Sequence, residues 1–334
     1  MTLVLLLLGC ATENLKGEIP RTGAQPSMGE PRRVGGNESF LRDLASESEP
    51  NPRDPQVRKG MEDGRTQVIE LQFEGKTRRY RVVPPDGYDA KRAWPVLIGY
   101  HGGGEGNTGV KMEVNWLPQR GGPQFLVFPD GDGGGWFVPG EGGGGPDTDP
   151  MRDVRFTDVM LADLKARWNI DKDEVYAVGF SNGAMFVWTL ICNNPEPFAG
   201  FAAVSAGMTD RTLSACSPQK TRPILYIHGT NDHNFAGRVS EGEHQLRITS
   251  SAETVQAITA AYNCKGEPAA DRRADRCSNG RVPVVQSFDT CKDKGKIEYV
   301  KVENGSHAWP GGREKCSNVD NDMILSFFGL SGQR

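Results

Sequence analysis

The stretch VYAVGFSNGAMFVWTLIC at residues 175–192 decides the fold class. Its opening run, Val175–Val178, is apolar and strand-like, whereas Ala184–Cys192 is apolar with helical character. Between them lies Gly179-Phe180-Ser181-Asn182-Gly183, a serine on a turn from strand to helix. A side chain in place of either glycine would collide with its surroundings, so the spacing predicts a strained turn that carries the Ser181 hydroxyl.

Three other segments with polar chemistry follow strand-like runs. His101-Gly102-Gly103-Gly104 comes directly after Val96–Tyr100, Asp232 follows Ile224–His228, and His307 follows a third apolar run. In open α/β sheets, ligands bind where the carboxyl ends of the strands meet. The order Ser, Asp, His along the chain predicts an α/β-hydrolase fold.

Strands alternate with helices from near Thr66 onward, which predicts one α/β domain at residues 66–334. We expect a mostly parallel, twisted sheet with helices on both faces and an N-terminal hairpin of Gln67–Phe73 and Thr77–Val83. The other expected strands are 96–100, 125–128, 175–178, 201–204, 224–228 and 297–302, and the expected helices are 154–168, 184–192, 252–262 and 319–328.

The N-terminus predicts export. Residues 1–10 are apolar but too few to cross a bilayer as a helix. Leu7-Leu8-Gly9-Cys10 is similar to a bacterial lipoprotein signal, so we expect lipidation of Cys10 and attachment to a membrane, at the cell surface or in the periplasm. An ordinary secretory signal or a chance apolar terminus are the alternatives. Residues 11–65 hold 19 charged residues and one aromatic residue, which predicts a disordered tether.

Composition excludes several classes of partner. The net charge of −4 and the lack of a basic cluster argue against nucleic acid. No C-x-x-C occurs and the acidic loops lack EF-hand spacing, so we expect neither a metal nor a cofactor. Beside Cys10 the chain has an even number of cysteines, which in an exported protein favours disulfides whose pairing the residues alone leave open. These are Cys192, Cys216, Cys264, Cys277, Cys291 and Cys316.

The chemistry predicted for Ser181 is nucleophilic. A serine hydroxyl needs a neighbouring base, for which His307 is the candidate, with Asp232 orienting the imidazole. The backbone N–H groups of Asn182 and Gly103 are the candidates for stabilising a developing oxyanion.

The other polar residues near these segments are weaker candidates for catalytic roles. His101 and His228 each precede a glycine and are expected to brace loops through side-chain hydrogen bonds. His233 adjoins Asp232 and is a poor candidate for the base, and Asp210 is a minor rival for the acid. Gly131–Gly145 has nine glycines and is either a surface loop or a cleft wall, to which Trp136 and Phe137 would contribute.

Together these segments resemble the polyhydroxybutyrate depolymerase and feruloyl esterase group of α/β-hydrolases. The matching pieces are His101-Gly102-Gly103, FPDG at 128–131, GFSNGAM at 179–185, HGTND at 228–232 and GSHAWPGG at 305–312. The resemblance implies a secreted serine esterase with Ser181, Asp232 and His307 as its triad.

The same resemblance implies disulfides Cys192–Cys216 and Cys264–Cys291, which leaves Cys277 for Cys316. It also makes Trp309, beside the base, a candidate for lining the acyl or alcohol pocket; packing of the loop is the alternative. The substrate implied is a feruloyl or acetyl ester on polysaccharide, or a polyhydroxybutyrate-like polyester. The alternative function is a non-catalytic surface lipoprotein of the same fold that binds a carbohydrate or polymer.

Overall fold

The computed structural model describes residues 64–104, 108–140, 149–239, 247–266, 268–272, 283–311 and 319–331. The expected export signal with Cys10, nearly all of the expected tether, and the cysteines Cys277 and Cys316 lie outside these residues. Among the helices within them, none has the length and apolar character that a membrane crossing requires.

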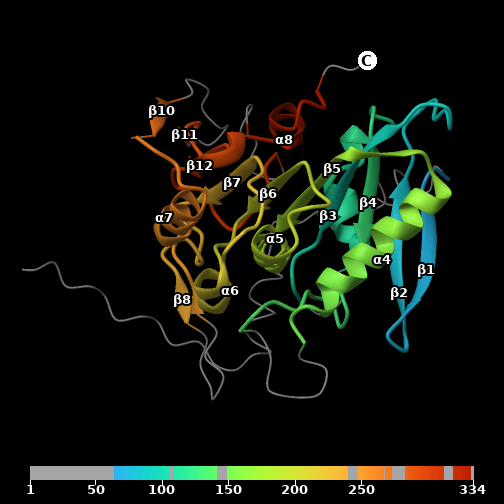
Figure 1. Ribbon diagram of the computed structural model, residues 1–334, viewed down its shortest axis with the longest axis horizontal. Helices are drawn as coiled ribbons and strands as arrows, with labels where there is room; N and C mark the ends of the chain where they lie inside the picture. Colours follow the sequence, from blue (N-terminus) through green and yellow to red (C-terminus); the bar gives the residue numbers. More distant parts are fainter. Residues whose placement is uncertain are drawn as a thin grey trace, which may run out of the picture. The chain divides into compact units, whose positions relative to one another are not determined.

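The described part of the chain forms one large mixed sheet in the order β1-β2-β4-β3-β5-β6-β7-β12-β11-β10, which can be followed in Figure 1 from blue to orange. The strands from β4 to β12 in this order run parallel, and antiparallel strands extend both edges. The predicted mostly parallel sheet and its N-terminal hairpin are therefore confirmed. The strands are β1 (Gln67–Phe73), β2 (Lys76–Val83), β3 (Trp94–Tyr100), β4 (Phe125–Pro129), β5 (Ile170–Phe180), β6 (Gly200–Val204), β7 (Ile224–Gly229), β10 (Ala269–Arg272), β11 (Pro283–Phe288) and β12 (Ile297–Val302).

Helices cover both faces of the sheet because successive strand side chains point to opposite sides. On β3, Val96 and Ile98 belong to one apolar core, and Leu97 belongs to the other. The first core includes side chains of α4 and α5, and the second includes side chains of α3 and α8. The helices are α3 (Gly109–Asn115), α4 (Arg152–Arg167), α5 (Asn182–Asn193), α6 (Asp210–Ala215), α7 (Ser251–Ala261) and α8 (Asn321–Phe327).

Several elements were not expected from the sequence. Helices α3 and α6 have seven and six residues, too few for a clear helical period. Strand β5 begins at Ile170, five residues before the apolar run, because Ile170 pairs with Trp94 at the start of β3. Strands β10 and β11, which extend the far edge of the sheet, were not among the expected strands.

Two disulfides link parts of the described chain. Cys192 near the end of α5 bonds to Cys216 after α6, and Cys264 after α7 bonds to Cys291. These are the two pairs that the family resemblance implied. Disulfides persist in oxidising compartments, so they fit an exported protein.

Candidate active site

The turn after β5 holds Ser181 in a conformation that non-glycine residues rarely adopt. Its φ and ψ are 54° and −118°, and Ser181 N donates to Val204 O on β6 at 2.9 Å. A Cβ atom on Gly179 would lie 2.2 Å from Gly183 O, and one on Gly183 would lie 2.2 Å from Tyr100 O. The glycines therefore let the turn close and let α5 approach the end of β3, as the spacing predicts.

Three side chains from separate strand ends form a continuous chain of hydrogen bonds. His307 Nε2 lies 3.0 Å from Ser181 Oγ, and His307 Nδ1 lies 2.9 Å from Asp232 Oδ2. Ser181 has no exposed surface, and His307 is 7% exposed. The two nitrogens of one imidazole thus connect a buried hydroxyl to a buried carboxylate, which is the geometry a serine nucleophile requires.

Asp232 is held by more than His307. Its Oδ1 accepts a hydrogen bond from Asn234 N at 2.8 Å, and His228 Nε2 lies 3.0 Å from Oδ2, off the line of an ideal hydrogen bond. Burial alone would raise the pKa of Asp232. The positive charge and hydrogen bonds that His307 and His228 offer outweigh burial and hold this pKa well below its usual range.

His228 has a role that the sequence reasoning missed in part. It was expected to brace a loop, and it does so by contacting the acid of the hydrogen-bonded chain. Its Nδ1 lies 2.7 Å from Tyr226 Oη and 2.9 Å from Ser251 Oγ, and burial raises the Tyr226 pKa well above its ordinary value. The protonated Tyr226 hydroxyl can donate to Nδ1, which leaves the imidazole proton on Nε2, facing Asp232.

His101 braces the glycine loop on the other side of Ser181, as expected. Gly131 N donates to His101 Nε2 at 2.9 Å, so Nδ1 carries the proton and donates to Gly102 O at 2.7 Å. Burial lowers the His101 pKa to about 4, so the ring stays neutral near pH 7. Both of its partners are main-chain groups, which holds the loop in place.

Asn182 and Trp136 join this loop to the start of α5. Trp136 N donates to Asn182 Oδ1 at 2.7 Å, and Trp136 Nε1 donates to His101 O at 2.9 Å. A Cβ atom on the neighbouring Gly135 would lie 3.2 Å from Asn182 Oδ1 and 3.9 Å from the Gly103 Cα. Gly135 thus lies close to both Asn182 and Gly103, the residues that carry the two candidate oxyanion donors.

The two tryptophans expected to line the substrate pocket are both 2% exposed. Trp136 stacks on Phe186 with ring centroids 5.3 Å apart. Trp309 donates from Nε1 to Asn321 Oδ1 at 2.8 Å and packs edge-on against Trp116. Their contact with a substrate stays a prediction. For Trp309, this packing favours the alternative in which the side chain packs the loop.

One group near the site has the composition of a metal site. Asp232, His233 and His307 can each offer a ligand atom, and these atoms lie within 4.8 Å of one another. Asp232 and His307 already bond to each other, so a cation would have to compete with the hydrogen-bonded chain. The expectation that no metal is required stays a prediction.

Comparisons with known proteins agree with this fold. Residues 153–259 match the phospholipase/carboxylesterase family. The chain is 30% identical over 281 residues to the protein named "Putative esterase NocK" from Nocardia uniformis subsp. tsuyamanensis, covering 77% of this chain and 78% of that protein. It is 23% identical over 250 residues to feruloyl esterase B from Piromyces equi, covering 71% of this chain but only 44% of that longer protein. The solved acetyl xylan esterase from Aspergillus awamori shares the fold, with a TM-score of 0.54 at 12% identity, covering 79% of this chain and all of that one.

The chain belongs to the esterase family of α/β-hydrolases. Its class of activity is the hydrolysis of carboxylic esters by a serine enzyme. The resemblance to feruloyl esterases expected from the sequence is thereby confirmed.

Proposed function

We propose that this protein is an exported esterase that cleaves feruloyl or acetyl esters on polysaccharide, with Ser181, His307 and Asp232 as its triad. The observation that carries the proposal is the unbroken chain of contacts from Ser181 Oγ through His307 to Asp232, at 3.0 and 2.9 Å. The printed names of the relatives, feruloyl esterase and acetyl xylan esterase, support the choice of ester.

The mechanism has two halves. In the first, Ser181 Oγ attacks the ester carbonyl carbon while its proton passes to His307 Nε2, and the tetrahedral intermediate collapses as His307 returns that proton to the departing alcohol. In the second, water attacks the acyl-enzyme, gives its proton to His307 and releases the acid, and the proton returns to Ser181. Asp232 stays ionised, because its lowered pKa disfavours protonation.

The negative charge of each tetrahedral intermediate needs donors. Asn182 is the first residue of α5, so its N–H points out of the helix N-terminus, where the positive end of the helix dipole lies. Gly103 is the second donor that we propose, and it lies near Asn182, because a Cβ atom on Gly135 would be 3.9 Å from the Gly103 Cα and 3.2 Å from Asn182 Oδ1. Removing a single oxyanion donor in other enzymes costs about 3–4 kcal/mol of transition-state stabilisation.

A panel of esters tests the activity and chooses the substrate. The protein, its Ser181→Ala variant and the control Ser214→Ala, which alters an exposed serine on α6, would each receive p-nitrophenyl acetate, methyl ferulate, acetylated xylan and a 3-hydroxybutyrate oligomer. We expect hydrolysis of the ferulate or the acetates by the parent and the control, and none above background by Ser181→Ala. Preference for the hydroxybutyrate oligomer would move the proposal to polyesters.

Labelling by a fluorophosphonate separates the esterase from the rival function, a non-catalytic lipoprotein that binds a carbohydrate or polymer. The probe reacts only with an activated serine, so we expect a single modified peptide that contains Ser181. A folded, oxidised protein that neither reacts with the probe nor turns over any ester would favour the binding protein.

Export and lipid attachment through Cys10 complete the proposal, and the two disulfides support the export. Fractionation of cells that produce the full chain, with mass spectrometry of the mature N-terminus, tests both. We expect a lipidated N-terminal Cys10 in the membrane fraction and release of a Cys10→Ser variant from it. A soluble exported protein with an unmodified N-terminus would support export but contradict lipid attachment.

A further inference from the structure

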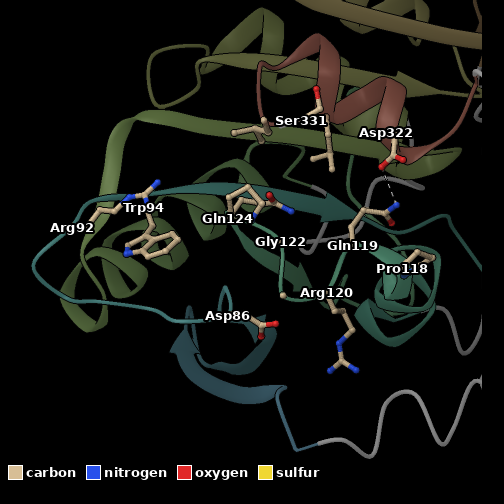
Figure 2. Close-up of a pocket in the computed structure, with 14 residues that line it drawn as sticks. Asp86, Arg92, Trp94, Pro118, Gln119, Arg120, Gly122, Gln124, Asp322 and Ser331 are labelled. Atoms are coloured by element: carbon tan, nitrogen blue, oxygen red, sulfur yellow. Dashed lines mark hydrogen bonds between the residues drawn. The ribbon is translucent and has the colours of Figure 1, made fainter. Parts of the chain in front are cut away.

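A cavity of about 740 Å³ (Figure 2) lies at the end of the sheet opposite to Ser181. Trp94, the first residue of β3, and Gln124, the residue before β4, both line it. His101 follows the other end of β3, so a strand of seven residues, about 20 Å long, separates the cavity from the active-site loops. Its volume lies within the range of small-molecule sites, about 300–1,000 Å³.

The Gln124 side chain marks the cavity as more than a packing gap. It is 1% exposed, and neither its amide nitrogen nor its amide oxygen has a hydrogen-bond partner among the described residues. Buried side-chain amides are almost always paired in native structures, since leaving them unpaired is costly. The amide offers a donor and an acceptor side by side, which a hydroxyl-bearing ligand can satisfy together.

The charges around the cavity balance and already have partners within the protein. Asp86 lies 3.0 Å from Arg65, and Arg120 lies 3.2 Å from Glu113. Asp322 accepts a hydrogen bond from Gln119 at 3.4 Å, visible as the dashed line in Figure 2. Because no sign of charge is in excess on the walls, the cavity suits a neutral ligand better than an anion or a cation.

Apolar surfaces alternate with these polar groups. Trp94, Pro118 and Pro123 line the cavity, and the Arg92 guanidinium lies 4.3 Å above the Trp94 ring. Neutral molecules that carry both hydroxyls and flat C–H faces, namely saccharides, match this mixture of amide, charged and apolar walls.

Gly122 leaves space beside the Gln124 side chain because it has no side chain of its own. A Cβ atom on Gly122 would lie 2.8 Å from Gln124 Nε2. A side chain here would occupy the space next to the unpaired amide, so Gly122→Ala gives a way to block the amide without altering it.

We infer that this cavity is a second, non-catalytic binding site for a neutral saccharide unit. The site needs neither Ser181 nor an ester bond in its ligand. The inference rests on the proposed function only for the choice of a xylan fragment as the probe.

Binding of xylohexaose, which carries no ester, tests the inference by titration calorimetry on the full chain. We expect millimolar or tighter binding by the parent. Binding should weaken at least about tenfold in Gln124→Leu, which removes the amide that would pair with the ligand, and in Gly122→Ala. Gln256→Leu, an exposed glutamine on α7, is the matched control and should bind as the parent does. Hydrolysis of p-nitrophenyl acetate should be equal in all four proteins, which also shows that the variants fold.

Three results would overturn the inference: no binding by the parent at millimolar xylohexaose, undiminished binding by both Gln124→Leu and Gly122→Ala, or loss of binding after fluorophosphonate has modified Ser181. Failure of the proposed function would appear separately, as absence of ester hydrolysis in proteins that still bind the saccharide.

Discussion

Ser181 lies between two loop regions that use buried histidines in opposite ways. On the β3 and β4 side, His101 bonds to the main chain at both ring nitrogens, through Gly131 N and Gly102 O. On the β7 and β12 side, His307 bonds to side chains at both nitrogens, through Ser181 and Asp232. A main-chain N–H keeps its proton when it donates a hydrogen bond to an imidazole, whereas a serine hydroxyl can transfer its proton to the ring. The partners, and not the residue type, therefore distinguish a histidine that braces a loop from the histidine that we propose as the base.

The largest expected difference between the two regions concerns Asp232. Asp232→Asn keeps the size of the side chain but offers His307 an amide in place of a carboxylate, so the imidazolium loses its partner and the tautomer is disturbed. We expect kcat to fall about 10⁴-fold, as for the equivalent change in other serine hydrolases. Steady-state kinetics on p-nitrophenyl acetate measures it, with the exposed Asp173→Asn as control. A loss of less than about tenfold would contradict the proposed role of Asp232 in the triad.

For His101 we instead expect an effect on the pH dependence of the free energy of unfolding. Its pKa falls from 6.5 to about 4 on folding, so between these values the unfolded chain binds a proton that the folded chain excludes. Stability therefore declines as pH drops, and His101 should contribute about 3 kcal/mol of this decline by pH 4. Urea unfolding at a series of pH values should show a shallower decline for His101→Gln than for the parent. Parallel curves would mean that the ring is not held neutral.

His228 tests whether the acid needs its second histidine. In His228→Phe, Asp232 keeps His307 and Asn234 N but loses its third partner, so we expect kcat to fall about tenfold with KM nearly unchanged. His228→Gln restores an N–H near the position of Nε2 and should recover most of the rate. Equal rates in the two variants would reduce His228 to a packing residue.

The smallest effect is expected where a side chain only positions a loop. Asn182→Ala keeps the backbone N–H proposed for the oxyanion but removes the bonds to Trp136, and we expect kcat to fall roughly fivefold. Asn193→Ala, at the other end of α5, is the control. A fall as large as that of Asp232→Asn would show that the Asn182 side chain itself contacts the reacting ester.

The sequence predicted the parts of the site that depend on local rules. The turn at Ser181 follows from backbone sterics at Gly179 and Gly183, and the meeting of strand ends follows from parallel topology, so the grouping of Ser181, Asp232 and His307 could be expected.

Other features depend on how side chains pack across long sequence distances. The sequence left open whether Trp309 lines the pocket or packs the loop, and the structure buries it against Asn321 on α8 and Trp116 after α3. Neither partner belongs to a recognisable motif. The contact of His228 with Asp232 was similarly hidden, because it requires the loop after β7 to turn back on itself, and nothing in the four-residue spacing specifies that turn.

The pair of glycines around Ser181 has a consequence for how such chains are recognised. Their role is to remove collisions of 2.2 Å with Gly183 O and Tyr100 O, and those collisions would exist with any residue at position 181. A descendant that lost its serine would therefore keep both glycines in order to fold. The two glycines therefore identify the fold of the turn. Only the serine hydroxyl with its two partners distinguishes an active enzyme from an inactive relative.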